Sequence, residues 1–168
     1  MSVFVKNNII YKSTIAGATT TITVAGFTDG VDSIELTNTV VHDNKTYSVE
    51  VFDEYFPMVD PDNDKDNGGK TSLKSIIIDG VKFFHTTDVY KDISTSFKDF
   101  QKLTSVTIKN VKKIEPEVFK DNKYITTVAM HNVEEVGTRA FTNSSVQTVT
   151  LSVGNDKIKK IDLDKECF

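Results

Sequence analysis

The stretch LTSVTIKNVKKIEPEVF, residues 103–119, is followed after five residues by ITTVAMHNVEEVGTRAF, residues 125–141. Both segments carry apolar residues at their first, fourth, sixth, ninth and twelfth positions, and both end on phenylalanine. The two starting residues lie 22 positions apart, and so do Phe119 and Phe141. Self-similarity at a fixed period of this size is typical of a repeat protein.

Three other segments begin with the same apolar-x-x-apolar-x-apolar signature, at Val31, Leu73 and Val146. We therefore predict that residues 31–168 form five repeats, which start near residues 31, 73, 103, 125 and 146. Residues 1–30 alternate between apolar and polar side chains and contain turn signals. We expect them to form a small N-terminal β cap that covers the first repeat.

The repeat unit predicts a short strand, because apolar residues that alternate along a chain lie on one face of a sheet. A single unit cannot bury that face alone, so neighbouring units must stack and share a core. Val, Ile and Thr make up about a third of the chain, while Leu and Ala are scarce, which favours strands over helices. We predict a β-rich repeat solenoid with a parallel sheet along one face. The phased Phe119 and Phe141 should be buried on the opposite side, with their rings stacked.

These units resemble the BspA-type leucine-rich repeat, a family of bacterial and some protozoan surface proteins. The segment from Val136-Gly137 to Ala140-Phe141 is similar to the "I-G-x-x-A-F" ending of the family, although Val118 and Cys167 stand where the family prefers alanine. The residues that carry the resemblance are Leu103, Val106, Ile108, Val111, Ile114 and Phe119 in one unit and Ile125, Val128, Met130, Val133, Val136, Ala140 and Phe141 in the next.

The resemblance implies a right-handed leucine-rich-repeat superhelix. It also implies a non-catalytic protein-binding module of a cell-surface or secreted protein, with adhesion to host matrix or to another cell as its concrete form. The start of the chain, Met1–Lys6, has too short an apolar run for a signal peptide, so the sequence itself does not decide the compartment. The alternative function is a structural spacer that presents another domain and has no ligand of its own.

Two segments interrupt the repeats, over residues 57–70 and 83–96. The first is polar and rich in turn residues, and its alternating carboxylates invite comparison with a calcium-binding loop. The match fails at Lys65, where such a loop needs glycine, and at Thr71, where it needs a bidentate glutamate. We therefore expect a solvated acidic surface loop and no metal site at the four carboxylates, which are Asp60, Asp62, Asp64 and Asp66.

Composition and motifs argue against several other classes of protein. The net charge of −4 and the single arginine, Arg139, disfavour nucleic-acid binding. The single cysteine, Cys167, excludes an internal disulfide framework and a cysteine zinc site. No apolar run is long enough to span a membrane. The three histidines have no metal-ligand spacing, and no nucleophile elbow, phosphate loop or dinucleotide fingerprint is present, so we expect neither an enzyme nor a cofactor. These histidines are His42, His85 and His131.

The outward side chains of the predicted strands form the candidate partner-binding surface. They alternate with the buried positions and, once the units stack, they form ladders rich in small hydroxyl residues. The same surface would suit an inert spacer, so this alternative stays open. The candidate residues are Ser75, Ile77, Asp79, Ser105, Thr107, Lys109, Thr127, Ala129, His131, Thr148, Thr150 and Ser152.

The C-terminal repeat has apolar residues that a following unit would cover. Its strand has an unpaired outer edge, and open edges tend to pair with another chain. Further repeats in a longer protein would cover it, and so would a second copy of the chain. We expect self-association through this repeat, whose apolar residues are Val149, Leu151, Ile158 and Ile161.

Overall fold

A computed structural model describes residues 2–52, 56, 69–82, 97–152 and 162–163. The predicted loops therefore lie outside the described residues, except for 69–70, which form a turn. The same is true of the four loop aspartates and of His85, Ile158, Ile161 and Cys167.

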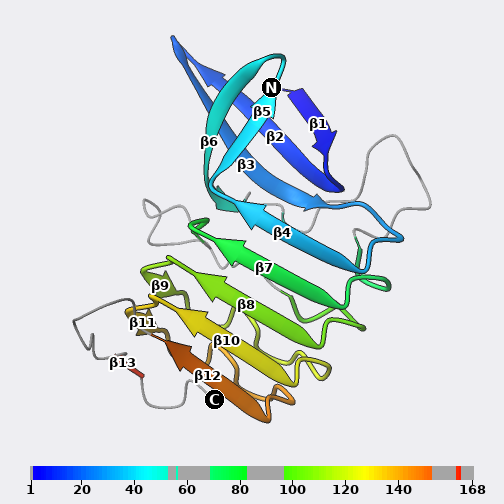
Figure 1. Cartoon of the computed structure of the whole chain (residues 1–168), viewed down its shortest axis with the longest axis vertical. Helices are drawn as coiled ribbons and strands as arrows, with labels where there is room; N and C mark the ends of the chain where they lie inside the picture. The colour runs from blue at the N-terminus through cyan, green and yellow to red at the C-terminus, as the bar shows by residue number, and fades with distance from the viewer. Residues whose placement is uncertain (1, 53–55, 57–68, 83–96, 153–161, 164–168) are drawn as a thin grey trace.

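The N-terminal part of the chain is a curled sheet with the strand order β1-β2-β3-β6-β5 (Figure 1). Its hairpins turn at residues with positive φ, such as Asn7 and Asn8, or Asp43 and Asn44. This left-handed conformation suits the right-handed twist of antiparallel strands and is easiest for Gly, Asn and Asp. The strands are β1 (Ser2–Lys6), β2 (Ile9–Ala16), β3 (Thr19–Phe27), β5 (Thr39–His42) and β6 (Lys45–Phe52).

The predicted cap over residues 1–30 contains β1, β2 and β3, and two later strands extend the same sheet to residue 52. β6 lies parallel to β3, and β5 pairs antiparallel with β6. Between β3 and β5 the chain thus leaves the cap, contributes residues 33–37 to the separate sheet that the repeats form, and then returns to the cap. The cap therefore extends to residue 52, beyond the predicted bounds of residues 1–30, because β5 and β6 pair with its sheet and not with the repeat sheet.

The repeats form a second sheet with the order β12-β10-β8-β7-β4, in which every neighbouring pair is parallel (Figure 1). Each of its strands spans the third to sixth residues of a predicted signature segment and the one residue that follows the segment. The molecule is therefore a β-rich repeat solenoid. The strands are β4 (Ser33–Thr37), β7 (Ser75–Asp79), β8 (Ser105–Lys109), β10 (Thr127–His131) and β12 (Thr148–Ser152).

The other side of the solenoid carries a sheet of very short parallel strands, in the order β13-β11-β9. These are β9 (Lys113–Ile114), β11 (Glu135–Val136) and β13 (Asp162–Leu163). They recur because each repeat turns at the same place and presents the same two residues to the next repeat.

The core lies between the two sides of the solenoid and contains the phased phenylalanines. Phe119 and Phe141 are 0% and 1% exposed, and their ring centroids lie 5.1 Å apart with planes 5° from parallel. Phe97 stacks on Phe119 at the same 5.1 Å distance. The prediction that these rings are buried and stacked is confirmed.

Candidate binding face

The outward residues of the repeat strands form three ladders across the five-stranded sheet. The strand register pairs each residue with its counterpart in the next unit. The predicted ladders are therefore present in the structure. In order along the solenoid they are Ser33, Ser75, Ser105, Thr127 and Thr148; Glu35, Ile77, Thr107, Ala129 and Thr150; and Thr37, Asp79, Lys109, His131 and Ser152.

The alternation of the strands explains why this face is open to solvent. In β8, for example, Val106 and Ile108 are fully buried, while the three residues beside them are half-exposed. The twelve predicted face residues are all half-exposed or exposed. Because adjacent strands lie about 4.8 Å apart, the face offers regularly spaced, mostly short side chains on a rigid backbone.

A row of hydrogen-bonded side chains borders the face where the strands end. Asn110 donates from Nδ2 to Asp79 Oδ1 at 2.7 Å, and Asn132 donates from Nδ2 to Asn110 Oδ1 at 2.9 Å. Both asparagines have positive φ, and their backbone N–H groups donate to the last residue of the following strand. Our prediction from the sequence did not include them, although an asparagine follows both strands at the 22-residue period.

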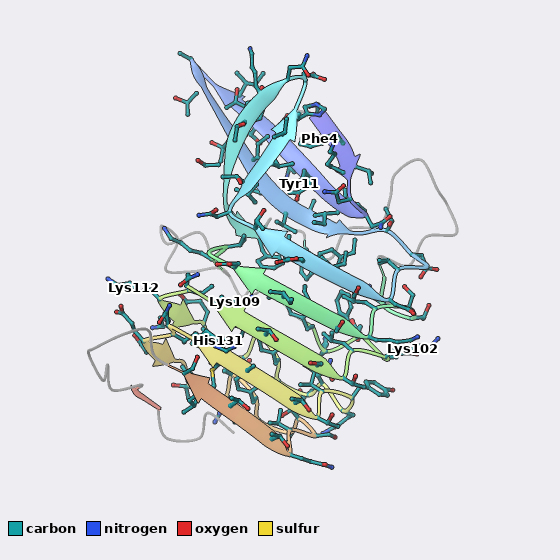
Figure 2. The ribbon with its side chains drawn as sticks, in the orientation of Figure 1. Phe4, Tyr11, Lys102, Lys109, Lys112 and His131 are labelled. Carbon is teal, nitrogen blue, oxygen red and sulfur yellow. The ribbon has the colours of Figure 1, made fainter. Side chains whose placement is uncertain are left out.

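The charges of the face change along the solenoid. Glu35 and Asp79 lie on its first two strands, whereas Lys109 and His131 lie on the next two, in the same ladder as Asp79. Figure 2 shows Lys109 and His131 side by side. His131 also shares a hydrogen bond with Ser152 on β12. The face therefore carries carboxylates at one end and basic side chains toward the other.

A separate charged cluster lies on the short sheet and is not part of the face. Lys113 Nζ lies 2.7 Å from Glu135 Oε1 and 3.9 Å from Glu115 Oε2. Burial raises the pKa of Glu115. The positive charge of Lys113 lowers this pKa in part, and the negative charge of Glu135 raises it further. The lysine between the two carboxylates makes this cluster an ion-pair network.

The two histidines in the described part of the chain belong to different sheets. His42 stacks on Phe4 in the cap with ring centroids 3.8 Å apart, and its Nε2 lies 3.5 Å from Asp43 Oδ2. Phe4 in turn stacks on Tyr11, and burial raises the pKa of Tyr11 to about 12 (Figure 2). The described residues contain no group of three or more His, Cys, Asp or Glu side chains that could hold a metal ion. They also contain no helix with the length and apolar character to cross a membrane.

This architecture, a parallel sheet built one strand per repeat with a stacked phenylalanine core, defines a repeat solenoid of the leucine-rich-repeat class. Residues 70–168 match the BspA type Leucine rich repeat region family, in six copies. The chain belongs to the BspA-type leucine-rich repeat family. No curated protein matches the chain.

Solved structures with a similar fold include a leucine-rich repeat protein from Bacteroides ovatus, with a TM-score of 0.55 and 15% identity over 88% of this chain. A leucine rich cell surface protein from Faecalibacterium prausnitzii matches 90% of this chain with 19% identity and a TM-score of 0.44. The chain spans 41% and 43% of the lengths of these two proteins.

Proposed function

We propose that the chain is a non-catalytic protein-binding module that takes its partner on the exposed face of the five-stranded sheet. The observation that carries the proposal is the in-register alignment of three solvent-exposed ladders over five parallel strands. Repeat proteins bind partners on extended faces of this kind, because stacked repeats give one continuous rigid surface. Rigidity lowers the entropy lost on binding, since the backbone of the surface is already ordered.

Membership of the BspA-type family supports a place at the cell surface or in secreted form. Adhesion, with a protein of the host matrix or of another cell surface as partner, is the concrete form of the proposal. The change from Glu35 and Asp79 to Lys109 along the face supports a partner that lies along the solenoid with the opposite order of charges.

The alternative proposal is a structural spacer that presents another domain. It is favoured by one feature of the face, which is that its described residues include no aromatic ring other than the imidazole of His131. Tyrosine and tryptophan are the side chains that most often supply binding energy at protein interfaces.

Bulky substitutions on the face distinguish the two proposals. We expect Thr107→Trp, Ala129→Trp and Thr150→Trp to reduce binding to surfaces coated with extracted extracellular matrix and to intact epithelial cells by at least about tenfold. Thr21→Trp, at an exposed strand position of the cap, is the matched control and should bind as the parent does. Equal binding by all four variants, or no binding by the parent, would favour the spacer.

A further inference from the structure

One large aromatic side chain lies open to solvent beside the binding face. Tyr124 is 42% exposed, and among the described residues no other tyrosine or phenylalanine ring is more than half-buried in this sense of lying open. It precedes the buried Ile125 and lies three residues before the start of β10, so it stands just outside the face. A tyrosine offers a large contact area at a low cost in side-chain entropy. The aromatic contact that the face itself lacks is therefore available at its margin.

The backbone that carries Tyr124 is held by a buried side chain. The N–H groups of Tyr124 and Ile125 donate to Oδ1 of Asn122 at 2.8 Å and 2.9 Å, and Asn122 is fully buried. Nδ2 of Asn122 in turn donates to the carbonyl of Phe97 in the preceding unit at 2.7 Å. Because this turn is already ordered, little backbone freedom is lost when a partner covers the tyrosine.

The segments that lead into β7, β8, β10 and β12 form one margin of the face, which we call the leading margin. They are residues 71–74, 101–104, 123–126 and 144–147. Hydrogen bonds join each segment to the next, since the N–H groups of Thr126 and Thr127 donate to the carbonyl of Thr104 at 2.9 Å and 3.1 Å. The same pair of hydrogen bonds recurs between the other neighbouring segments. The leading margin is therefore as continuous as the sheet that it borders.

The leading margin is positively charged. Its four segments contain three lysines, which are Lys74, Lys102 and Lys123, and they contain no carboxylate. Lys74 Nζ pairs with Asp32 Oδ2 at 2.9 Å, and Lys123 Nζ donates to the carbonyl of Asn143. Lys102 is exposed and forms no ion pair with any residue in the described part of the chain. Its ammonium group is therefore the one on this margin that is best placed to pair with a partner.

Lys102 and Tyr124 occupy equivalent positions in successive units, 22 residues apart. Neighbouring strands of a sheet lie about 4.8 Å apart, so one partner segment can reach both side chains. A carboxylate pairs with an ammonium group, and an apolar side chain packs on an aromatic ring. Figure 2 shows Lys102 and Lys109 at opposite ends of β8, so both ends of this strand carry a charge that favours an acidic partner.

We propose that the protein partner of the sheet face also covers the leading margin, where an acidic segment of the partner places a carboxylate on Lys102 and an apolar side chain on the ring of Tyr124. This inference rests on the proposed function, to which it adds an anchoring residue and the chemistry of the segment that is bound. The three lysines of the margin disfavour a basic segment, because like charges brought together at an interface weaken binding.

Binding to surfaces coated with extracted extracellular matrix tests the anchoring residue. We expect Tyr124→Ala to weaken binding at least about tenfold, because it removes the exposed ring. Tyr124→Phe should bind as the parent does, since it keeps the ring and loses only the hydroxyl group. Val41→Ala, at an exposed apolar position of the cap, is the control and should also bind as the parent does. Equal binding by Tyr124→Ala and the parent would overturn the proposal.

Charge substitutions on the same surfaces test the acidic character of the partner. We expect Lys102→Glu to weaken binding at least about tenfold and Lys102→Arg to retain it. Lys45→Glu, at an exposed position of the cap, makes the same change of net charge and should bind as the parent does. Rising salt should weaken binding of the parent more steeply than binding of Lys102→Gln, because salt screens the charge that this variant lacks. Equal effects of Lys102→Glu and Lys45→Glu would contradict the proposed contact.

Competition and enzyme treatment identify the class of the partner. A soluble copolymer of glutamate and tyrosine should displace the parent chain from the matrix, whereas polylysine should not. Matrix treated with heparinase and chondroitinase should bind the chain as untreated matrix does. Loss of binding after this treatment would overturn the acidic protein segment in favour of a sulfated polysaccharide, and failure of the copolymer to compete would also count against the proposal.

The outcomes separate this inference from the proposed function. If Ala129→Trp loses binding while Tyr124→Ala and Lys102→Glu bind as the parent does, the face binds the partner and the leading margin does not. If the parent chain itself does not bind, the proposed function fails and this inference fails with it.

Discussion

At the scale of single residues, two kinds of buried side chain stabilise the solenoid. Phenylalanines make the same ring contact in successive units, and Asn122 makes a set of buried hydrogen bonds. Phe119 lies between the rings of Phe97 and Phe141. Asn122 is fully buried and uses both ends of its amide, donating to the carbonyl of Phe97 and accepting from the N–H groups of Tyr124 and Ile125. Burial of this polar side chain is tolerated because its hydrogen bonds are satisfied.

Truncation of Phe119 to alanine should lower the free energy of unfolding by about 3–5 kcal/mol, because it removes a buried ring that two neighbours enclose. Urea denaturation measures the effect. Tyr124→Ala, at a side chain that is 42% exposed, is the control and should cost below about 1 kcal/mol. A loss below about 1 kcal/mol at Phe119 as well would show that the phased ring is not part of the core.

Substitution of Glu115 by glutamine should change the pH dependence of stability. Because burial raises the pKa of Glu115 above its ordinary 4.5, the folded state holds this proton more tightly than the unfolded state. The resulting stability is fully present below the ordinary pKa and is lost as the pH rises through the raised pKa. Glu115→Gln removes this dependence, so the stability of the variant relative to the parent should increase as the pH rises.

Denaturant midpoints measured for both proteins at about pH 4 and pH 7 check this expectation. A difference between variant and parent that is the same at both pH values would contradict the assignment of the raised pKa to Glu115.

At the scale of elements, the turns of the solenoid repeat their backbone conformation as closely as the strands do. Positive φ recurs at positions 22 residues apart, at Asn110 and Asn132, at Glu117 and Arg139, and at Asp121 and Asn143. The left-handed conformation is unfavourable for residues with a Cβ, especially for glutamate and arginine. The stacking of the repeats therefore determines the backbone conformation of these turns, and the intrinsic preference of each residue does not.

Gly137 is required by a close approach of two such turns. A Cβ at this position would lie 2.7 Å from the nitrogen of Pro116 in the preceding unit. Backbone atoms cannot give way as a flexible side chain does, so Gly137→Ala should cost about 1–3 kcal/mol. Gly17→Asn is the control, because Gly17 has open space around it and asparagine adopts its positive φ. Thermal or urea unfolding that shows equal, small changes for both variants would contradict the close contact.

At the scale of the whole molecule, the cap and the solenoid share one hydrophobic core. Phe27 of the cap contacts Phe56 and Phe100, with ring centroids 5.4 Å and 6.1 Å apart. Backbone hydrogen bonds also cross the junction, since the N–H of Phe52 donates to the carbonyl of Lys82 at 3.0 Å. The cap thus covers the apolar end of the first repeat, as a terminal unit of a solenoid must.

We expect cap and solenoid to unfold together. Phe27→Ala should lower the stability of the whole chain by about 3–5 kcal/mol and reduce hydrogen-exchange protection in β2 and in β10 by the same factor. Ile15→Ala, at a cap side chain that is 67% exposed, should leave both strands protected. Loss of protection in the cap alone would show that the two parts unfold separately.

The sequence by itself determined the repeat period, the positions of the repeat strands, the buried phenylalanine positions and the three outward ladders. These features follow from local rules, because alternation decides which face a strand residue occupies and a constant period places equivalent residues beside one another. Asn110 and Asn132 also recur at the repeat period. The sequence did not show that their side chains form a hydrogen-bonded row, because that row depends on Asp79 in a neighbouring unit as the acceptor.

Only the tertiary structure decided how the chain divides between cap and solenoid. Residues 33–37 join the repeat sheet, while 39–42 and 45–52 return to the cap beside β3. Strand pairing between distant segments depends on which edges are free in space, and the alternation within a strand does not specify its partner.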